Sequence, residues 1–233
     1  MTNRLQGLYI ITPSLFSNNE SSREESSNNE SSSKNTFDSQ QLNNYLDKIE
    51  AALKSGACVV QFRDKSVNGA LRISLARALI ELCQSYHALF IINDDVELAA
   101  KIGAQGVHLG KDDTSVSLAR ERLGKQAIIG VSCYNQISLA RKAKAQGADY
   151  IAFGRFFPSR TKPNAVQADI GLLIQAKKEL HLSVAAIGGI DQENAHQLIK
   201  AGADLLAVVG GVLDQADISL AAKAIVNCFK KPK

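Results

Sequence analysis

The sequence predicts a closed (β/α)8 barrel, in which eight parallel strands are each followed by a helix. Short apolar segments alternate eight times with amphipathic stretches, which is the pattern of a parallel sheet covered by helices. The 233 residues, 45% of them hydrophobic, are enough for one large core. Four near repeats, KSGACVV, KIGAQGVHL, AQGADYIAF and KAGADLLAV, place a glycine before the next apolar segment. Glycine there allows the left-handed backbone that ends a helix, so the repeats indicate helix-to-strand turns.

Each predicted strand is an apolar run that ends abruptly in polar residues or glycine, and each predicted helix follows one of these runs. We expect residues 1–233 to form a single barrel domain. The strands are expected at Leu8–Thr12, Val59–Arg63, Leu89–Asp94, Gly106–Gly110, Ile128–Ser132, Tyr150–Gly154, Val184–Gly189 and Leu205–Gly211. The helices are expected at Leu42–Lys54, Leu71–Ser85, Val96–Ile102, Ser115–Leu123, Gln136–Gln146, Ile170–Leu180, Gln192–Ala201 and Ile218–Phe229.

An open, doubly wound sheet is the main alternative to the barrel. That fold usually has a glycine-rich first turn, and the first segment here, GLYIITP, is not one. One stretch interrupts the alternation: Ser17–Thr36 is polar, of low complexity and free of aliphatic residues. Such a composition cannot bury enough apolar surface to offset its ordering entropy. We expect a disordered insertion in the first βα loop, either a neutral expansion or a lid over the active-site mouth.

Composition excludes several classes of protein. The 27 basic and 23 acidic residues give a net charge of only +4, without the clustered basic excess of a nucleic-acid binder. The four cysteines are widely separated and have no zinc-finger spacing, so we expect reduced thiols. No segment has the apolar length of a signal peptide or a membrane span. We expect a cytoplasmic protein without membrane or nucleic-acid partners, and homo-oligomer formation stays open.

In a barrel of this kind, functional side chains come from the carboxyl ends of the strands and the loops that follow them. After the second strand, Gln61, Arg63 and Lys65 alternate along the chain, so they can converge on one ligand. Salt bridges with neighbouring carboxylates would also explain the two cations. Further polar residues follow later strands: Asn93, Asp94, Asp95, Lys111, Asp112, Asp113, Ser132 and Asn135.

Asp94 and Asp113 are the candidate metal ligands, because they follow adjacent strands. Magnesium commonly uses one or two carboxylates together with substrate phosphates. Aspartate is also a preferred helix N-cap, and we assign that role or a supporting one to Asp95 and Asp112. His108 lies between Val107 and Leu109, so the sequence favours a packed residue of the barrel interior over a catalytic one.

The last strands and the loop after the sixth predict a second site, for another anion. The pairs Gly188-Gly189 and Gly210-Gly211 lie where strands seven and eight meet their loops, the usual phosphate site of such barrels. Tight turns without a ligand would also require glycine. The loop Arg155–Asn164 is long, basic and rich in hydroxyl groups, so it could close over two anionic groups.

These motifs together resemble the thiamine-phosphate synthase family of (β/α)8 enzymes. The blocks QFRDK, NDD, VHLGKDD, GVSCYN, SRTK, IGGI and GADLLAVVGG occur in that family's order and span nearly the whole chain except Ser17–Thr36. The resemblance implies a transferase that couples 4-amino-2-methyl-5-hydroxymethylpyrimidine diphosphate to a thiazole phosphate. The products would be thiamine phosphate and pyrophosphate, and one Mg²⁺ per active site would be the cofactor.

The resemblance also implies roles for individual residues. Asp94 and Asp113 would bind Mg²⁺, and Arg63, Lys65 and Lys162 would be catalytic by neutralising the diphosphate. The same three cations, with Gln61, Asn93 and Ser132, would hold the pyrimidine diphosphate. The thiazole phosphate would be bound by Ser159, Thr161, Gly189, Val209 and Gly210. The flanking Phe62, Asp64 and Arg160 are also predicted to bind substrate.

Three departures from the family pattern affect the expected phosphate pocket. Arg155 replaces a common Pro, Ser159 a common Thr, and Val209-Gly210 a common Ile-Ser pair. Three rival functions remain at this point. They are a thiazole tautomerase of the same superfamily, a non-catalytic barrel that senses thiamine precursors, and a sugar-phosphate epimerase or isomerase that uses Asp94 and Asp113 as an acid/base pair.

Overall fold

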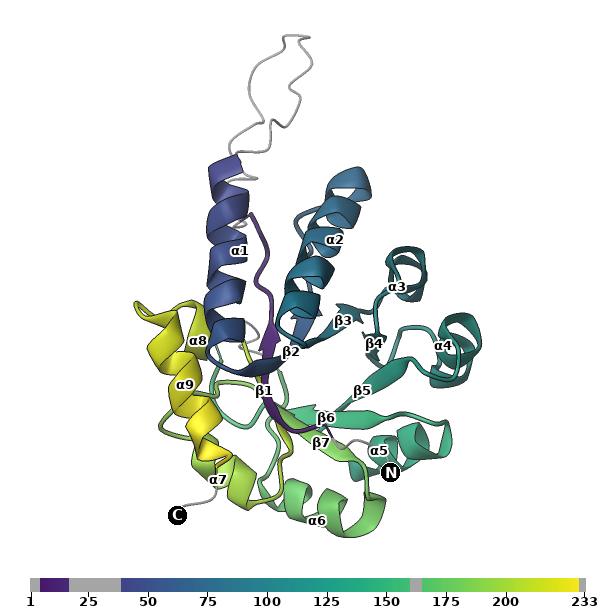
Figure 1. Cartoon of the computed structure of the whole chain (residues 1–233). Helices are drawn as coiled ribbons and strands as arrows, with labels where there is room; N and C mark the ends of the chain where they lie inside the picture. The colour runs from purple at the N-terminus through teal and green to yellow at the C-terminus, as the bar shows by residue number, and fades with distance from the viewer. Residues whose placement is uncertain (1–4, 17–38, 160–164, 231–233) are drawn as a thin grey trace, which may run out of the picture.

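In a computed structural model, eight parallel strands close into a barrel that is surrounded by helices (Figure 1). The structure describes residues 5–16, 39–159 and 165–230. Each strand pairs with the next in sequence, and β8 pairs with β1, which closes the sheet. The predicted barrel is therefore confirmed, and the open, doubly wound alternative is excluded. The insertion Ser17–Thr36 lies outside the described residues, so its predicted disorder remains a prediction.

The strand bounds agree with the sequence prediction to within about two residues, except at the end of β8. The strands are β1 (Gly7–Ile11), β2 (Ala57–Phe62), β3 (Leu89–Asn93), β4 (Gly106–Leu109), β5 (Ile128–Tyr134), β6 (Tyr150–Gly154), β7 (Ser183–Ile187) and β8 (Leu205–Val208). The helices are α1 (Ser39–Lys54), α2 (Gly69–Ser85), α3 (Val96–Ile102), α4 (Val116–Leu123), α5 (Ile137–Ala145), α6 (Gly171–Leu180), α7 (Ala195–Lys200), α8 (Gly210–Leu213) and α9 (Ile218–Cys228).

The short helix α8 corrects the sequence prediction, which placed Gly210 and Gly211 at the end of the last strand. Pairing between β8 and β1 ends at Val208, so the backbone beyond it has no strand partner. Val212 and Leu213 are buried within the following turn. A helical turn buries these two side chains, whereas an extended segment would expose every second one.

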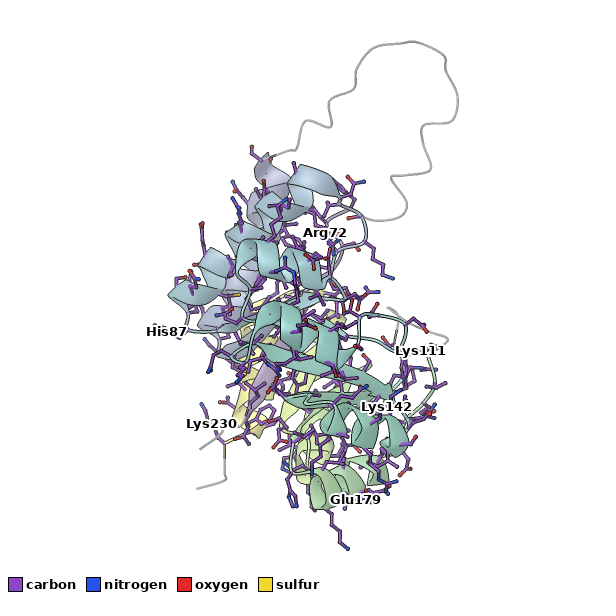
Figure 2. All side chains as sticks on the ribbon, turned by 90° about the vertical axis from the view of Figure 1, so that its right-hand side faces the viewer. Arg72, His87, Lys111, Lys142, Glu179 and Lys230 are labelled. Atoms are coloured by element: carbon purple, nitrogen blue, oxygen red, sulfur yellow. The ribbon has the colours of Figure 1, made fainter. Side chains whose placement is uncertain are left out.

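The core has two layers because side chains of each strand alternate between the barrel interior and the helices. The interior contains residues such as Tyr9, Val59 and Tyr150. The outer layer packs their neighbours, including Leu8 and Val60, against the apolar faces of the helices. Figure 2 shows charged side chains on the outside of the molecule, with Lys142 and Glu179 labelled, and both residues are exposed.

The amino-terminal end of the barrel is held by side chains that directly precede three of the strands. Gln105, Asp149 and Asp204 precede β4, β6 and β8. Their side-chain oxygens accept hydrogen bonds from the backbone N–H groups of Phe90, Ile129 and Val184 on the preceding strands, at 2.9, 2.7 and 2.9 Å. In the sequence, each of the three follows the Gly-Ala of a near repeat. The repeats therefore mark strand-end hydrogen bonds as well as helix ends.

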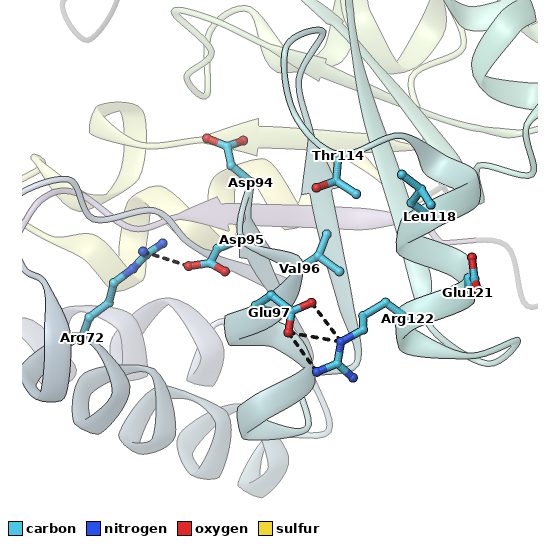
Figure 3. A pocket seen from close by; sticks show the side chains of 9 residues that line it. All are labelled: Arg72, Asp94, Asp95, Val96, Glu97, Thr114, Leu118, Glu121 and Arg122. Carbon is cyan, nitrogen blue, oxygen red and sulfur yellow. Dashed lines mark hydrogen bonds and ion pairs between the residues drawn. The ribbon is translucent and has the colours of Figure 1, made fainter.

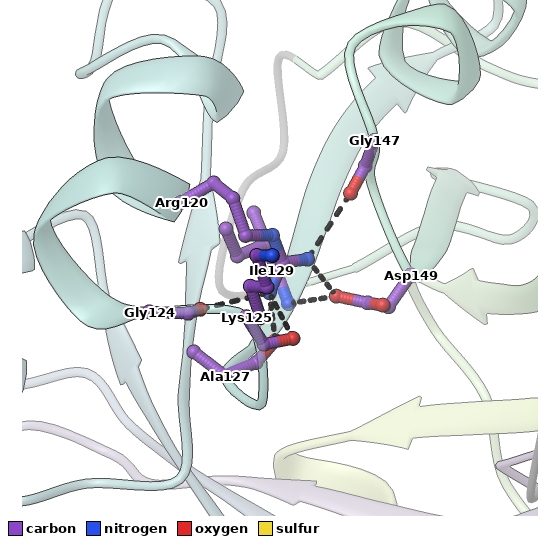
Figure 4. A network of polar contacts seen from close by, with 7 residues as sticks. All are labelled: Arg120, Gly124, Lys125, Ala127, Ile129, Gly147 and Asp149. Atoms are coloured by element: carbon purple, nitrogen blue, oxygen red, sulfur yellow. Dashed lines mark hydrogen bonds and ion pairs between the residues drawn. The ribbon is translucent and has the colours of Figure 1, made fainter.

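Two cations complete this end of the barrel. Arg120 donates to Asp149 at 2.6 Å and also to the backbone carbonyls of Gly147, Gly124 and Ala127 (Figure 4). Lys177 donates to both carboxylate oxygens of Asp204 at 2.7 Å. These contacts tie the ends of helices to the starts of strands.

The four cysteines are free, as predicted. Burial raises the pKa of the Cys58 thiol to about 11 and that of the Cys83 and Cys133 thiols to about 12, so all three are protonated at neutral pH. Among the described residues, no helix is both long and apolar enough to cross a membrane.

Candidate active site

The opposite, carboxyl end of the barrel brings the predicted site residues together. Strands β2, β3 and β4 are neighbours, with Phe62 aligned to Ile92 and Asn93 aligned to His108. The residues that follow these strands therefore lie at one rim. Distant parts of the sequence meet there because parallel neighbours end on the same side of the sheet.

Asp94 and Asp113 approach each other at this rim. The backbone N–H of Asp94 donates to the His108 carbonyl at 2.8 Å, which fixes Asp94 beside β4. Asp113 accepts a hydrogen bond from the Gly110 backbone N–H at 2.6 Å, which turns its carboxylate back towards the end of the same strand. The two carboxyl groups are close enough to share a hydrogen bond.

The environment of Asp94 disfavours the charged form of its carboxyl group. Partial burial, followed by the hydrogen bond and negative charge of Asp113, raises the pKa of Asp94 to about 6. Asn93 and Arg63 lower it by smaller amounts. Asp94 also has a φ of 63°, a left-handed conformation that is uncommon outside glycine. Paired carboxylates in this arrangement suit a hard divalent cation, which would relieve their repulsion.

A cleft of about 280 Å³ lies beside the carboxylates. Arg63 and Lys65 line it, and among the described residues neither of them forms an ion pair with a carboxylate. The salt-bridge explanation considered for these two cations therefore finds no support in the described part of the chain. The full lining is Arg63, Asp64, Lys65, Val67, Arg72, Asn93 and Asp94.

A larger groove of about 850 Å³ runs from Asp94 between α3 and α4 (Figure 3). In it Arg72 pairs with Asp95 at 3.0 Å and Arg122 pairs with Glu97 at 2.9 Å. Asp95 also caps α3 by accepting from the Leu98 backbone N–H at 2.8 Å, as the sequence predicted. Figure 3 shows the Asp94 side chain turned away from this paired set.

The glycines predicted to bind phosphate lie where the loops after β6, β7 and β8 pack closely. A Cβ at Gly189 would lie 2.2 Å from the Pro158 carbonyl oxygen, and a Cβ at Gly211 would lie 2.0 Å from that of Ile190. Gly189 also has a φ of 64°. Tight packing therefore explains glycine at both positions, while their backbone groups stay at the rim.

Gln61 and Ser132, two further predicted residues, are joined below the rim through the barrel interior. Hydrogen bonds run from Gln61 to Tyr9, from Tyr9 to Tyr150, from Tyr150 to His108 and from His108 to Ser132. His108 is buried, as the sequence predicted.

Comparison with known proteins is consistent with this geometry. A family model described as thiamine monophosphate synthase matches residues 36–212. The chain belongs to this family. The chain is 42% identical over 227 residues to the thiamine-phosphate synthase of Thioalkalivibrio sulfidiphilus, covering 97% of both chains. Its identity to the enzyme of Nitrosococcus oceani is 52% over 181 residues, covering 78% of this chain and 83% of the other.

A solved structure of the family agrees in fold. Thiamine phosphate pyrophosphorylase from Pyrococcus furiosus superposes with a TM-score of 0.75 and 27% identity, covering 96% of this chain and 95% of the other. The family resemblance drawn from the motifs is thus confirmed. The roles of the individual residues remain predictions.

The family resemblance predicted that Phe62 and Asp64 bind substrate. In the structure, both side chains contact other parts of the protein instead. The Phe62 side chain is 1% exposed and packs in the outer apolar layer, so only its backbone can face a substrate. The Asp64 carboxylate accepts from the Leu15 backbone N–H at 2.6 Å and from the Ser66 backbone and hydroxyl at 2.7 and 2.6 Å. These bonds tie the first two βα loops together, and we assign Asp64 that structural role.

The remaining predicted residues divide into two sets. Ser159, Gly189, Val209 and Gly210 lie in the segments that follow β6, β7 and β8. Arg160, Thr161 and Lys162 lie outside the described residues. Arg155, a departure from the family pattern, donates from Nε to the Ala165 carbonyl at 2.8 Å and so holds the two described ends of its loop together.

Sequence reasoning did not select Tyr9 or Tyr150. Both lie within apolar runs, where tyrosine is indistinguishable from any other core residue. The available signal was that each places a hydroxyl group at an inward-facing position, where it needs a polar partner.

Proposed function

We propose that this chain forms thiamine phosphate by joining 4-amino-2-methyl-5-hydroxymethylpyrimidine diphosphate to a thiazole phosphate, with release of pyrophosphate. One observation carries the proposal. Arg63 and Lys65, which have no ion-pair partner within the described ranges, meet the Asp94 and Asp113 carboxylates at a single rim of the barrel. Such a site suits a diphosphate that arrives with a divalent metal.

The reaction has little need of a general base. The thiazole nitrogen attacks with a lone pair and has no proton to lose. The pyrimidine methylene carbon loses pyrophosphate as its C–O bond breaks, and the C–N bond to the thiazole forms. The demanding event is the departure of a highly charged leaving group, so catalysis depends on groups that neutralise the growing charge.

Arg63 and Lys65 are proposed to bind the diphosphate oxygens and to hold the leaving group as its charge increases. Arg63 is half-buried and its backbone N–H is fixed by the Thr12 hydroxyl at 3.0 Å, which limits the movement of its attachment point. Asn93 precedes Asp94 and hydrogen-bonds to its carboxylate. By resemblance, Lys162 acts on the same diphosphate.

Asp94 and Asp113 are proposed to hold one Mg²⁺. The two carboxylates fit this role because they are close, repel each other and follow adjacent strands. Within the described ranges, no cluster of three or more metal-binding side chains occurs. Two carboxylates nevertheless fit a magnesium ion that completes its coordination with water and substrate phosphate. When bound, the ion would neutralise charge on the leaving pyrophosphate.

The thiazole phosphate is proposed to bind across the rim, at the loops after β6, β7 and β8. Ser159, Gly189, Val209 and Gly210 supply a hydroxyl group and backbone groups there, and by resemblance Arg160 and Thr161 extend the set. The replacement of a serine hydroxyl by Gly210 leaves a backbone N–H to serve the phosphate.

The test is direct and separates the rival functions. Purified protein is incubated with both precursors, with Mg²⁺ or with a chelator, and thiamine phosphate and pyrophosphate are quantified. We expect equal amounts of the two products, dependent on Mg²⁺. Isomerised thiazole phosphate as the only product would support the tautomerase. Tight binding of the precursors without turnover would support the sensor.

A further inference from the structure

We propose that Arg72, on α2, is a positioning residue for the metal site, because it holds the turn that carries Asp94. It acts through Asp95, the next residue along the chain, and in this role it touches neither the metal nor the substrate. The inference rests on the proposed function, because it concerns the Mg²⁺ site proposed there. Neither the strand-end motifs nor the family resemblance selected Arg72.

Asp94 lies at the centre of a strained turn between β3 and α3. The Asp95 backbone N–H donates to the Asn93 carbonyl at 2.8 Å, and Asp94 between them has a φ of 63°. A hydrogen bond across three residues, with a positive φ at the central one, defines a rare and strained γ-turn. A residue other than glycine keeps such a conformation only when its surroundings hold it there. The contacts around the turn therefore decide where the Asp94 carboxylate points.

The turn is anchored on both sides. On the first side, the Asp94 backbone N–H donates to the His108 carbonyl at 2.8 Å, which joins the turn to β4. On the second side, one carboxylate oxygen of Asp95 accepts from the Leu98 backbone N–H at 2.8 Å. The other carboxylate oxygen accepts from Nη1 of Arg72 at 3.0 Å. Asp95 is therefore held by α3 and by α2 at once, and the Arg72 bond is the tie to α2.

Stability alone does not account for an arginine at position 72. Arg72 is the fourth residue of α2, near the positive end of the helix dipole, where a cation is disfavoured. Its Nε atom is buried and has no hydrogen-bond partner among the described residues, which is a further cost. The side chains of Arg72 and Asp95 are 29% and 33% exposed, so solvent weakens what their ion pair contributes to the fold. These costs fit a contact that serves the site.

The position of Arg72 lets it act on the metal site. Its side chain lines both the cleft beside the carboxylates and the groove between α3 and α4. Figure 3 shows Arg72 reaching Asp95, while the Asp94 side chain points away from this pair. The negative charge of Asp113 opposes the close approach of Asp94, so a relaxed turn would let the two carboxylates separate. The bond from Arg72 restrains the turn and keeps them in place to share one cation.

The experiment compares Arg72→Gln with Arg122→Gln, which is the matched control. Both arginines line the same groove, and each forms an ion pair with an acidic residue at the start of α3. Arg72 pairs with Asp95, which belongs to the turn, whereas Arg122 pairs with Glu97, which lies beyond it. The two variants lose the same charge, so a difference between them reports the link to the turn.

Metal binding is measured with Mn²⁺, a paramagnetic substitute for Mg²⁺, by electron paramagnetic resonance. Each protein is titrated alone and with saturating pyrophosphate. We expect Arg72→Gln to raise the Kd for Mn²⁺ about 10-fold, because it removes a group that supports a metal ligand. Arg122→Gln should leave this Kd within about twofold of wild type.

Steady-state kinetics should show the same separation. In Arg72→Gln, the Mg²⁺ concentration that gives half the maximal rate should rise about 10-fold. At saturating Mg²⁺, kcat should fall by less than about threefold, because the metal ligands themselves are intact. The conservative variant Arg72→Lys can still donate one hydrogen bond to Asp95, so it should lose less metal affinity than Arg72→Gln.

Hydrogen exchange in the metal-free protein tests the turn directly. The Asp95 amide closes the turn, and it should exchange about 10-fold faster in Arg72→Gln than in wild type. The Val184 amide, bonded to Asp204 at the other end of the barrel, should exchange at the wild-type rate, which shows that the fold is not loosened throughout. If Arg72→Gln fails to fold, Asp95→Asn weakens the same ion pair from the other side and should also raise the Kd for Mn²⁺.

An unchanged Kd for Mn²⁺ in folded Arg72→Gln, or an equal rise in Arg122→Gln, would overturn the inference while the proposed function stands. A higher KM for the pyrimidine diphosphate with unchanged metal affinity would also overturn it, because Arg72 would then contact the substrate. A wild type that binds no Mn²⁺, with or without pyrophosphate, would do the same. Failure of a Mn²⁺-binding wild type to form any coupled product would instead overturn the proposed function.

Discussion

The two ends of the barrel use charge in opposite ways. At the amino-terminal end, Lys177 holds both carboxylate oxygens of Asp204 at 2.7 Å, and Arg120 pairs with Asp149 at 2.6 Å. At the carboxyl end, two carboxylates lie together, while Arg63 and Lys65 have no ion-pair partner among the described residues. One end satisfies its charges within the chain, and the other keeps them available for ligands.

The difference shows which charges serve folding and which serve binding. The paired side chains at the amino-terminal end also bond to strand backbones, so their removal affects the barrel itself. At the rim, the Asp94 and Asp113 carboxylates repel each other, and the Asp94 backbone has an unusual conformation. Both features are typical of binding sites, where function is favoured over stability. We therefore expect substitutions at the carboxyl end to lower activity and substitutions at the amino-terminal end to lower stability.

The largest effect is expected from Asp94→Asn. Loss of a carboxylate proposed to bind Mg²⁺ should lower kcat/KM by about 1,000-fold, measured as thiamine phosphate formation. Stability should respond in the opposite sense. The folded-state pKa of about 6 lies above the ordinary value of 3.8, so ionisation of Asp94 destabilises the fold fully above pH 6, and this destabilisation is lost as the pH falls from about 6 to below 3.8. At pH 7.5 without metal, the variant should unfold at an equal or higher temperature.

Asp95→Asn is the control for Asp94→Asn. Asp95 is the next residue, but it caps α3 and pairs with Arg72. This variant should keep substantial activity and lose some stability, through the weakened ion pair. An equal loss of activity in both variants would contradict the separate roles.

Lys162→Ala tests a role that follows from resemblance alone. Neutralisation of the leaving pyrophosphate should matter most in the transition state, so kcat should fall by about 100-fold with little change in either KM. Steady-state kinetics with both substrates varied will measure this. An unchanged kcat at saturating substrate would refute the role.

Asp204→Ala probes the opposite end. It would leave the Lys177 ammonium group and the Val184 backbone N–H without this carboxylate, in a region where the Asp204 side chain is only 10% exposed. We expect the free energy of unfolding to fall by about 3 kcal/mol in urea titrations. Activity per folded molecule should stay within about twofold of wild type. Glu81→Ala, an exposed change on α2, serves as the control and should be neutral.

The smallest effect is expected from Arg122→Gln in the groove between α3 and α4. Its pair with Glu97 lies on the surface, with the side chains 52% and 72% exposed, so solvent screens it. The unfolding midpoint should not move measurably. A clear loss of activity without loss of stability would show that this groove also binds substrate.

Much of the fold could be predicted because its signals are local. The alternation of apolar runs and amphipathic stretches, together with the glycine-ended repeats, placed the strands and most helices within about two residues, apart from the end of β8. The failure at α8 has a local cause as well. Gly210 and Gly211 continue an apolar run, and nothing nearby indicates that strand pairing stops at Val208.

The candidate site was predicted from strand ends and family motifs, which identify residue types but not their partners. Asp64 and Arg63 are neighbours in one motif, yet the structure uses the first to join two loops and leaves the second facing a cleft. Their separate roles depend on contacts with residues such as Leu15, almost fifty positions away.

By itself, the sequence determined the barrel, the family and the residues that reach its carboxyl rim, because periodicity and motif order are written along the chain. Only the tertiary structure decided which charges are paired and that Tyr9, Tyr150 and His108 connect Gln61 to Ser132. Hydrogen bonds and ion pairs require groups within about 3 Å, and closure of the barrel creates that proximity between residues separated by as many as 141 positions.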